Sequence, residues 1–167
     1  MRFDWPLTNG EFRARAVSGY RVRPAVRDDL DGMLAVISAA YASDPVWREL
    51  TADIERRVGG RIRDHLEDPR AHFTVAEREG AIVALNGVAL DHPTRQSLIT
   101  GICVAPAHQG RGLGTALLAV SLAWLRDRGV ATATVTTDGQ SVAARVYARF
   151  GAIRTSGVAH EDAPKPR

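Results

Sequence analysis

The sequence predicts an α/β domain, in which helices pack against a sheet. Segments rich in apolar and β-branched residues alternate with segments whose apolar residues recur at helical spacing. Residues 97–118 contain both kinds of segment: a strand-like apolar segment is followed by a glycine-rich loop and then directly by a strongly apolar helix. With 167 residues, 45% of them hydrophobic and 25% charged, the chain has the size and composition of one domain with its own core.

The first half of the chain predicts two helices that follow a strand. Residues 1–19 show no clear period, and we expect them to be an extension that packs on the surface or is disordered. Residues 20–24 should form a strand, followed by helices over residues 30–41 and 51–66. Gly59 and Gly60 predict a kink in the second helix, or its division into two shorter helices, because each glycine weakens a helix by roughly 1 kcal/mol.

The second half of the chain predicts most of the sheet. Residues 71–77 and 81–90 should form a hairpin. Residues 97–104 are apolar on both faces, as in a central strand, and Gly101 within them indicates a bulge or a close approach of backbone or ligand. The remaining elements are a helix, a strand, a second helix and a last short strand, expected at residues 113–128, 131–137, 141–150 and 152–158.

Charge and cysteine content narrow the functional classes. The net charge is +3, and all the basic residues except Lys165 are arginines, which either coding bias or an acidic ligand would explain. The sequence has no long basic run with interleaved aromatics, so nothing in it indicates a nucleic-acid partner. Cys103 is the only cysteine, so no intrachain disulfide can form. We find no apolar run long enough to span a membrane and no signal-peptide core, and we therefore expect a cytoplasmic protein.

The glycine-rich loop over residues 109–114 predicts an anion site. Its three glycines leave backbone N–H groups unobstructed, and the helix that follows directs its positive dipole end to the same place, as in phosphate-binding loops. A plain turn is the simplest alternative. A Rossmann turn is another, with Asp138 as the ribose partner, but residues 105–109 separate the glycines from their strand and too little chain follows. A P-loop would need Gly-Lys-Ser/Thr, which is absent.

Gln109, Gly112 and Gly114 match the pattern Arg/Gln-x-x-Gly-x-Gly/Ala after an apolar strand and a proline. This stretch resembles the acyl-CoA-binding motif of the GNAT superfamily of N-acetyltransferases, and residues 147–152 are similar to the family's closing Tyr-x-x-x-Gly-Phe. The resemblance implies a GNAT domain over residues 20–159, between the N-terminal extension and a C-terminal tail at residues 160–167. It implies a mixed sheet flanked by helices and splayed between two parallel strands, residues 97–104 and 131–137. The family has one more edge strand near the C-terminus, which here is missing, supplied by a partner or formed by the tail.

The resemblance also implies an activity. It points to acetyl-CoA as co-substrate, to a primary amine that attacks the thioester directly in a ternary complex, and to no metal. Tyr147 is the implied general acid, which returns a proton to the thiolate of CoA. A plain core aromatic is its alternative role. The residues implied to bind acetyl-CoA are Ile102, Cys103, Val104, Gln109, Gly110, Arg111, Gly112, Leu113, Gly114, Thr115, Gln140 and Tyr147.

Other roles are less specified by the sequence. Cys103 could act as a nucleophile, but no histidine lies near it in its strand or the adjoining turn. The general base is not visible, and its candidates are Asp91, His92, Asp138 or an ordered water. His72, His108 and His160 are expected at the surface.

The acceptor side is the least specified. In the family, the region between the first two helices forms a wall of the acceptor site, which here places Tyr41, Asp44 and Trp47 there, although ordinary packing would also explain them. The expected acceptor is a small-molecule or peptide amine, and domains of this family often pair as homodimers. An acyl-CoA-binding sensor or partner module with little catalysis is the alternative function.

Overall fold

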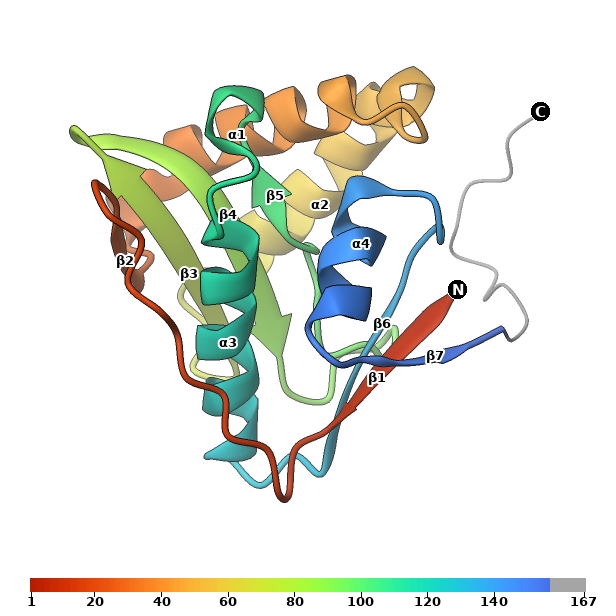
Figure 1. Ribbon diagram of the computed structural model, residues 1–167. Coiled ribbons are helices and arrows are strands. Elements are labelled where there is room, and N and C mark those ends of the chain that lie inside the picture. Colours follow the sequence, from red (N-terminus) through yellow and green to blue (C-terminus); the bar gives the residue numbers. More distant parts are fainter. Residues whose placement is uncertain (157–167) are drawn as a thin grey trace.

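The computed structural model describes residues 1–156, which form two sheets and four α-helices (Figure 1). One sheet has the strand order β2-β3-β4-β5 and the other the order β6-β1-β7, and the ladders within both are antiparallel. The predicted mixed α/β fold class is confirmed. The strands are β1 (Arg2–Pro6), β2 (Arg21–Pro24), β3 (Ala71–Arg78), β4 (Ala81–Ala89), β5 (Cys103–Val104), β6 (Thr132–Thr136) and β7 (Ile153–Thr155), and the helices are α1 (Leu30–Ser43), α2 (Thr51–His65), α3 (Leu113–Arg126) and α4 (Val142–Arg149).

Helices cover both faces of the four-stranded sheet (Figure 1). On one face, Met33 of α1 and Ile62 of α2 share a core with Leu85 of β4. On the other face, Leu117 of α3 shares a core with Ala84, the preceding residue of the same strand. Successive strand residues point to opposite faces, so β4 needs apolar residues at consecutive positions to serve both layers.

Helix α2 is continuous from Thr51 to His65, so the division into two shorter helices, one of the two alternatives expected at Gly59 and Gly60, is wrong. Gly59 is buried, and a Cβ atom added to it would lie 3.1 Å from a methyl carbon of Leu34 in α1. The glycine thus allows the two helices to approach closely. The packing of α2 on α1 therefore outweighs the weak helix propensity of the two glycines.

The N-terminal residues form a central strand, which differs from the surface or disordered extension expected for them. β1 lies between β6 and β7 and is hydrogen-bonded to both, with Arg2 opposite Thr136 on one side and Thr155 on the other. Its apolar residues belong to the core, because Phe3 and Trp5 are only 1% and 2% exposed. In the part of the chain that the structure describes, the partner of β7 is therefore the chain's own N-terminal strand.

The strand expected over residues 97–104 is interrupted at Gly101. Leu98 makes a single bridge to Val88, and the regular ladder to β4 resumes only at Cys103. Between them, the Thr100 hydroxyl accepts from the Gly87 amide (2.7 Å) and donates to the Gly101 carbonyl (2.8 Å). Gly101 has a φ of +71°, a conformation that favours glycine. The bulge or close approach predicted there is present as a break in the strand.

The two sheets meet at one end only. The amides of Ser97 and Leu98 both donate to the carbonyl of Thr134 in β6, over 2.9 and 3.2 Å, and the Thr134 amide donates to the Ser97 hydroxyl. Beyond this point β5 and β6 make no ladder with each other in the described residues. The structure therefore has a V-shaped opening between the two sheets, as expected from the splayed sheet.

The ends of α3 and α4 follow their sequence signals. Gly112 begins α3 in the left-handed conformation, with a φ of +87°. The side chain of Ser141 accepts a hydrogen bond from the Ala144 amide and so caps α4, as its position predicts. Gly151, with a φ of +79°, lies just beyond α4. The expected tail at residues 160–167 lies outside the described residues.

Candidate functional site

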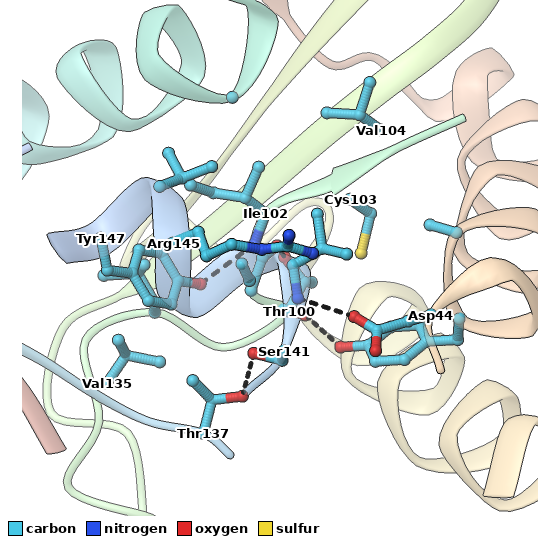
Figure 2. A pocket seen from close by; sticks show the side chains of 18 of the residues that line it. Asp44, Thr100, Ile102, Cys103, Val104, Val135, Thr137, Ser141, Arg145 and Tyr147 are labelled. Atoms are coloured by element: carbon cyan, nitrogen blue, oxygen red, sulfur yellow. Dashed lines mark hydrogen bonds between the residues drawn. The ribbon is translucent and has the colours of Figure 1, made fainter. Parts of the chain in front are cut away.

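A cavity of about 650 Å³ fills the opening between the two sheets. Strand β5 and the loop before it line one side, and β6 lines the other. The N-terminal part of α3, one side of α4 along its whole length, and residues of α1, α2 and their connection complete its wall. Figure 2 shows side chains from these elements converging on one space, with Tyr147 and Asp44 on opposite sides of it. The fold therefore brings together segments that are far apart in the chain.

The glycine-rich loop presents free backbone donors to this cavity. Gly110 and Gly112 adopt positive φ angles of 74° and 87°, which turn the backbone tightly before α3 begins. Within residues 1–156, no amide from Gly110 to Thr115 donates to another group of the protein. The donors lie at the N-terminus of a helix, where the dipole is positive. This geometry suits a phosphate or pyrophosphate.

The edge of β5 that faces away from β4 is also part of the site. The Ile102 amide donates to the hydroxyl of Tyr147 (3.3 Å), and the Val104 carbonyl accepts from the side chain of Gln109 (3.0 Å). The N–H and C=O of one strand residue point to the same edge, so the Val104 amide also faces the opening. An extended, amide-bearing ligand lying along this edge would find backbone partners there.

Tyr147 is buried, and its hydroxyl lies beside the backbone of the strand break (Figure 2). A Cβ atom added to Gly101 would lie 3.4 Å from this hydroxyl oxygen, an ordinary van der Waals contact, so the positive φ of Gly101 and not the phenol favours glycine there. Burial raises the pKa of Tyr147 far above that of an ordinary tyrosine, although the hydrogen bond from the Ile102 amide lowers it. The phenol therefore stays protonated at neutral pH and can serve as a proton donor.

Cys103 and Tyr41 lie on the α1 side of the cavity. Burial raises the pKa of the Cys103 thiol to about 12, so the thiol is protonated at neutral pH. This argues against the nucleophile alternative for Cys103, since the thiolate is the reactive form. Burial also raises the pKa of Tyr41, whose hydroxyl donates to the Thr100 carbonyl over 3.2 Å. Both groups are thus neutral parts of the wall.

The charged residues that line the cavity are mostly basic. Arg61 comes from α2, and Arg145 and Arg149 come from one face of α4. Asp44 is the one carboxylate that lines the cavity within the described residues. The surplus of positive charge favours an anionic ligand. The two arginines of α4 were not among the residues predicted for the site, although their spacing of four residues, next to Tyr147, is a signal that they share a face.

Asp44 is a structural link as well as a wall residue. One of its carboxylate oxygens accepts from the Val46 amide and the other from the Val142 amide, both over 2.9 Å. Val142 is the first residue of α4, so this bond ties the connection between α1 and α2 to the helix that carries Tyr147. Tyr41 and Trp47, the other two residues expected at the acceptor side, line the same cavity.

Several candidate residues lie elsewhere. Arg111 and Gln140 are exposed and do not line the cavity. Of the three candidates for the general base, Asp91 and His92 line a second hollow, and Asp138 accepts from the amide of Gln140 in an exposed turn. None of the three lines the candidate site.

The histidines differ in part from their expected surface positions. His108 lines the cavity and is hydrogen-bonded to the Tyr20 hydroxyl over 2.9 Å. His72 is half-buried and stacks on Trp124, with ring centres 5.3 Å apart. His160 lies outside the described residues. His108 follows the proline of the turn before the glycine loop, and this position was the signal that it would lie near the ligand.

The model of the acetyltransferase (GNAT) family matches residues 35–152. The chain belongs to this family. The match includes β5, the glycine-rich loop, α3 and α4, which are the elements that surround most of the cavity. It does not include β1 or β7.

Relatives within the GNAT family are similar over most of this chain but are longer proteins. A mycothiol acetyltransferase of Streptomyces coelicolor is 32% identical over 89% of this chain and 48% of its own length. One of Sanguibacter keddieii is 35% identical over 86% of this chain and 45% of its own length. The chain thus spans about half the length of the curated relatives that it matches.

Solved structures show the same fold. A GCN5-related N-acetyltransferase from Ralstonia eutropha superposes with a TM-score of 0.60 and 26% identity, covering 85% of this chain and 97% of that one. A predicted acetyltransferase with acetyl-CoA from Clostridium acetobutylicum gives a TM-score of 0.62 at 17% identity, covering 86% and 96%. The likeness to this second protein concerns the fold alone.

Within residues 1–156, no helix is both long and apolar enough to cross a membrane. No three or more His, Cys, Asp or Glu side chains gather there in a group that could hold a metal ion.

Proposed function

We propose that this chain is an acetyl-CoA-dependent N-acetyltransferase that moves an acetyl group to a primary amine in a ternary complex. One observation carries the proposal. The unpaired amides from Gly110 to Thr115 and the exposed edge of β5 face one cavity, which also holds a protonated tyrosine. The diphosphate of CoA would accept from the loop amides, and the pantetheine chain would extend along the edge of β5 towards Tyr147.

The reaction needs few protein groups. The lone pair of the amine attacks the thioester carbonyl, the C–N bond forms, and the Val104 amide stabilises the oxyanion. When the C–S bond breaks, the sulfur takes its electron pair and the Tyr147 hydroxyl gives it a proton. None of the three predicted bases lines the cavity, so in this proposal the proton of the attacking amine passes to water, and water returns a proton to the Tyr147 phenolate. In this proposal Tyr147 is the one side chain that exchanges a proton with the reacting atoms.

A small-molecule amine is the proposed acceptor class, rather than a peptide. The curated relatives are named for mycothiol, which is a small molecule, and the acceptor end of the cavity is a partly enclosed space between Tyr41, Asp44 and Trp47. Asp44 already accepts two backbone N–H groups, so in this proposal the aromatic rings contribute more to amine binding than the carboxylate does.

The first test measures binding and turnover separately. Titration calorimetry with acetyl-CoA should show binding, and a panel of small amines should then release CoA thiol in an amine-dependent way. Tyr147→Phe should lower kcat by about 100-fold, because a positioned general acid contributes at least that much. The dissociation constant for acetyl-CoA should stay within about two-fold.

Asp53→Asn is the control, since Asp53 forms an exposed ion pair with Arg56 and does not line the cavity. It should keep the wild-type kcat. Because none of the three predicted bases lines the cavity, a second candidate function is an acyl-CoA-binding module with little catalysis. Binding without thiol release across the amine panel would support that candidate and contradict the enzyme proposal.

A further inference from the structure

Two aromatic side chains of β1 pack on the ring of Tyr147. The ring centres of Phe3 and Trp5 both lie 5.4 Å from that of Tyr147, Trp5 nearly perpendicular to it at 84° and Phe3 at 60°. All three side chains are at most 2% exposed. Tilted and edge-on aromatic pairs at this separation are attractive beyond the area that they bury. The ring of Tyr147 is therefore in contact with a strand that lies outside the family match.

The two ends of the tyrosine side chain have different supports. Its hydroxyl accepts from the Ile102 amide in the opening between the sheets, while its ring packs against Phe3 and Trp5. The hydroxyl lies at the far end of a rigid ring, so a tilt of the ring displaces the oxygen from both the amide and the cavity. Contacts on the ring thus decide where the proton donor is held.

β1 is itself firmly placed. It is hydrogen-bonded along both edges, to β6 and to β7, and the amide of Thr137 donates to the carbonyl of Met1 over 3.0 Å. Thr137 also lines the cavity, so the N-terminal segment is hydrogen-bonded to a residue of the cavity wall. A strand paired on both sides is a stiffer support than a loop would be.

We propose that Phe3 and Trp5 are positioning residues for the Tyr147 hydroxyl, so that the N-terminal strand is part of the acetyl-transfer machinery of this chain. The inference rests on the proposed role of Tyr147 as proton donor. It goes beyond that role, because it assigns a function in the reaction to a segment that the family match does not cover.

Trp5 supports Tyr147 through the contact between their rings, and its indole N–H plays no part in this contact. The indole N–H of Trp5 is buried and has no hydrogen-bond partner within the described residues. Trp5→Phe therefore keeps a ring against Tyr147 and removes only an unsatisfied donor. Trp5→Leu keeps an apolar side chain but removes the ring. The two variants separate the aromatic contact from simple burial.

The experiment measures kcat and KM for both substrates in Trp5→Leu, Phe3→Leu and Trp5→Phe, beside wild type and Tyr147→Phe. The two leucine variants should each lower kcat by about 10-fold, because small displacements of a catalytic group are costly. Their KM for acetyl-CoA should stay within about two-fold, since the glycine loop is intact. Trp5→Phe should retain kcat within about two-fold of wild type.

Leu125→Ala is the control for general loosening. Leu125 is fully buried in the same core, near the C-terminal end of α3, and does not line the cavity. This variant should lose stability and keep the wild-type kcat. An equal fall in kcat for Leu125→Ala would overturn the inference, because positioning by β1 would then not be specific.

The other outcomes are also decisive. If Tyr147→Phe lowers kcat while the leucine variants do not, the inference is wrong and the proposed function stands. If Tyr147→Phe keeps the wild-type kcat, the proposed proton donor is wrong, and the inference fails with it. Should Trp5→Leu not fold, Phe3→Leu and Trp5→Phe decide the question by the same comparison.

Discussion

Asp29 forms a partly buried ion pair with Arg23 where the chain enters α1. Its carboxylate accepts two hydrogen bonds from the guanidinium of Arg23, at 2.7 and 2.9 Å, and a third from the Val26 amide. Arg23 also bonds to Glu77 of β3. Hydrogen bonds from Arg23, together with that from Val26, hold the pKa of Asp29 below its usual value. The pair thus joins β2 and β3 to the start of the first helix.

Asp29→Asn should destabilise the protein at pH 7 by about 2 kcal/mol, because it weakens the charged hydrogen bonds of Arg23 while Glu77 still compensates part of its charge. The ionised carboxylate is favoured in the folded state, so its contribution is complete above the unfolded pKa of about 4 and is lost as the pH falls through the lower, folded value. The gap between wild type and variant in urea unfolding should therefore shrink below about pH 4. Asp53→Asn, which removes an exposed pair with Arg56, should change stability by less than about 1 kcal/mol.

The position of Asp44 at the cavity could be predicted from the sequence, but its hydrogen-bond partners could not. Its position between two helices and beside aromatic residues predicted a place at the cavity, and it lines the cavity. Its second hydrogen bond goes to Val142, which is 98 positions away in the chain. No local pattern indicates such a partner. The glycine-rich loop could be predicted because its donors and its helix are consecutive in sequence, whereas the role of Asp44 depends on tertiary packing.

Helix α2 contains two adjacent glycines in different surroundings, so substitutions at these two positions can distinguish the contribution of helix propensity from that of packing. A Cβ atom at Gly59 would meet Leu34 at 3.1 Å, whereas one at Gly60 would meet nothing within 4 Å. Both residues are helical, so alanine would favour the helix equally at either position. The difference between the two sites is therefore the contact with α1.

Gly60→Ala should raise the free energy of unfolding by about 1 kcal/mol, the usual gain for alanine over glycine in a helix. Gly59→Ala should gain less than Gly60→Ala, or lose stability, because Leu34 must move by a few tenths of an ångström. Chemical denaturation of the two variants beside wild type is the measurement. An equal gain for both would mean that the approach of α1 and α2 does not depend on Gly59.

At the scale of elements, local signals identified most helices and strands, and β1 is the instructive failure. Phe3, Trp5 and Leu7 alternate with other residues, which is the pattern of a strand with one buried face. The pattern is short and contains Pro6, so it could not be told from an irregular segment. Its partners, β6 and β7, lie at the other end of the chain. The strand is specified by long-range pairing that no local period displays.

The molecule as a whole consists of two antiparallel sheets joined at Ser97 and Thr134, with the candidate site where they diverge. A ligand in the opening would contact both sheets and the helix N-termini between them. Binding should therefore stabilise the junction of the two halves more than the outer strands. Amide hydrogen exchange can detect this difference, because it reports local opening along the chain.

On addition of acetyl-CoA, peptides covering Val104 and Gly110–Thr115 should lose the most exchange, since these amides face the cavity and those of the loop have no protein acceptor in the described residues. Peptides covering β2, at the far edge of the four-stranded sheet, should exchange as before. Protection at β2 without protection at the glycine loop would contradict the placement of the ligand. Free CoA, which shares the diphosphate, should protect the loop to a similar extent.

The position of β1 has a consequence for how the protein is made. Residues 2–6 leave the ribosome long before β6 and β7, their two partners, have been translated. The aromatic side chains of Phe3 and Trp5 therefore remain exposed in the nascent chain until the three-stranded sheet has formed. Pairings this distant in sequence carry a high loop-closure entropy and slow the search for the native state. We therefore expect the three-stranded sheet that packs on Tyr147 to form late in biosynthesis. Until then its apolar residues are exposed and can be bound by chaperones.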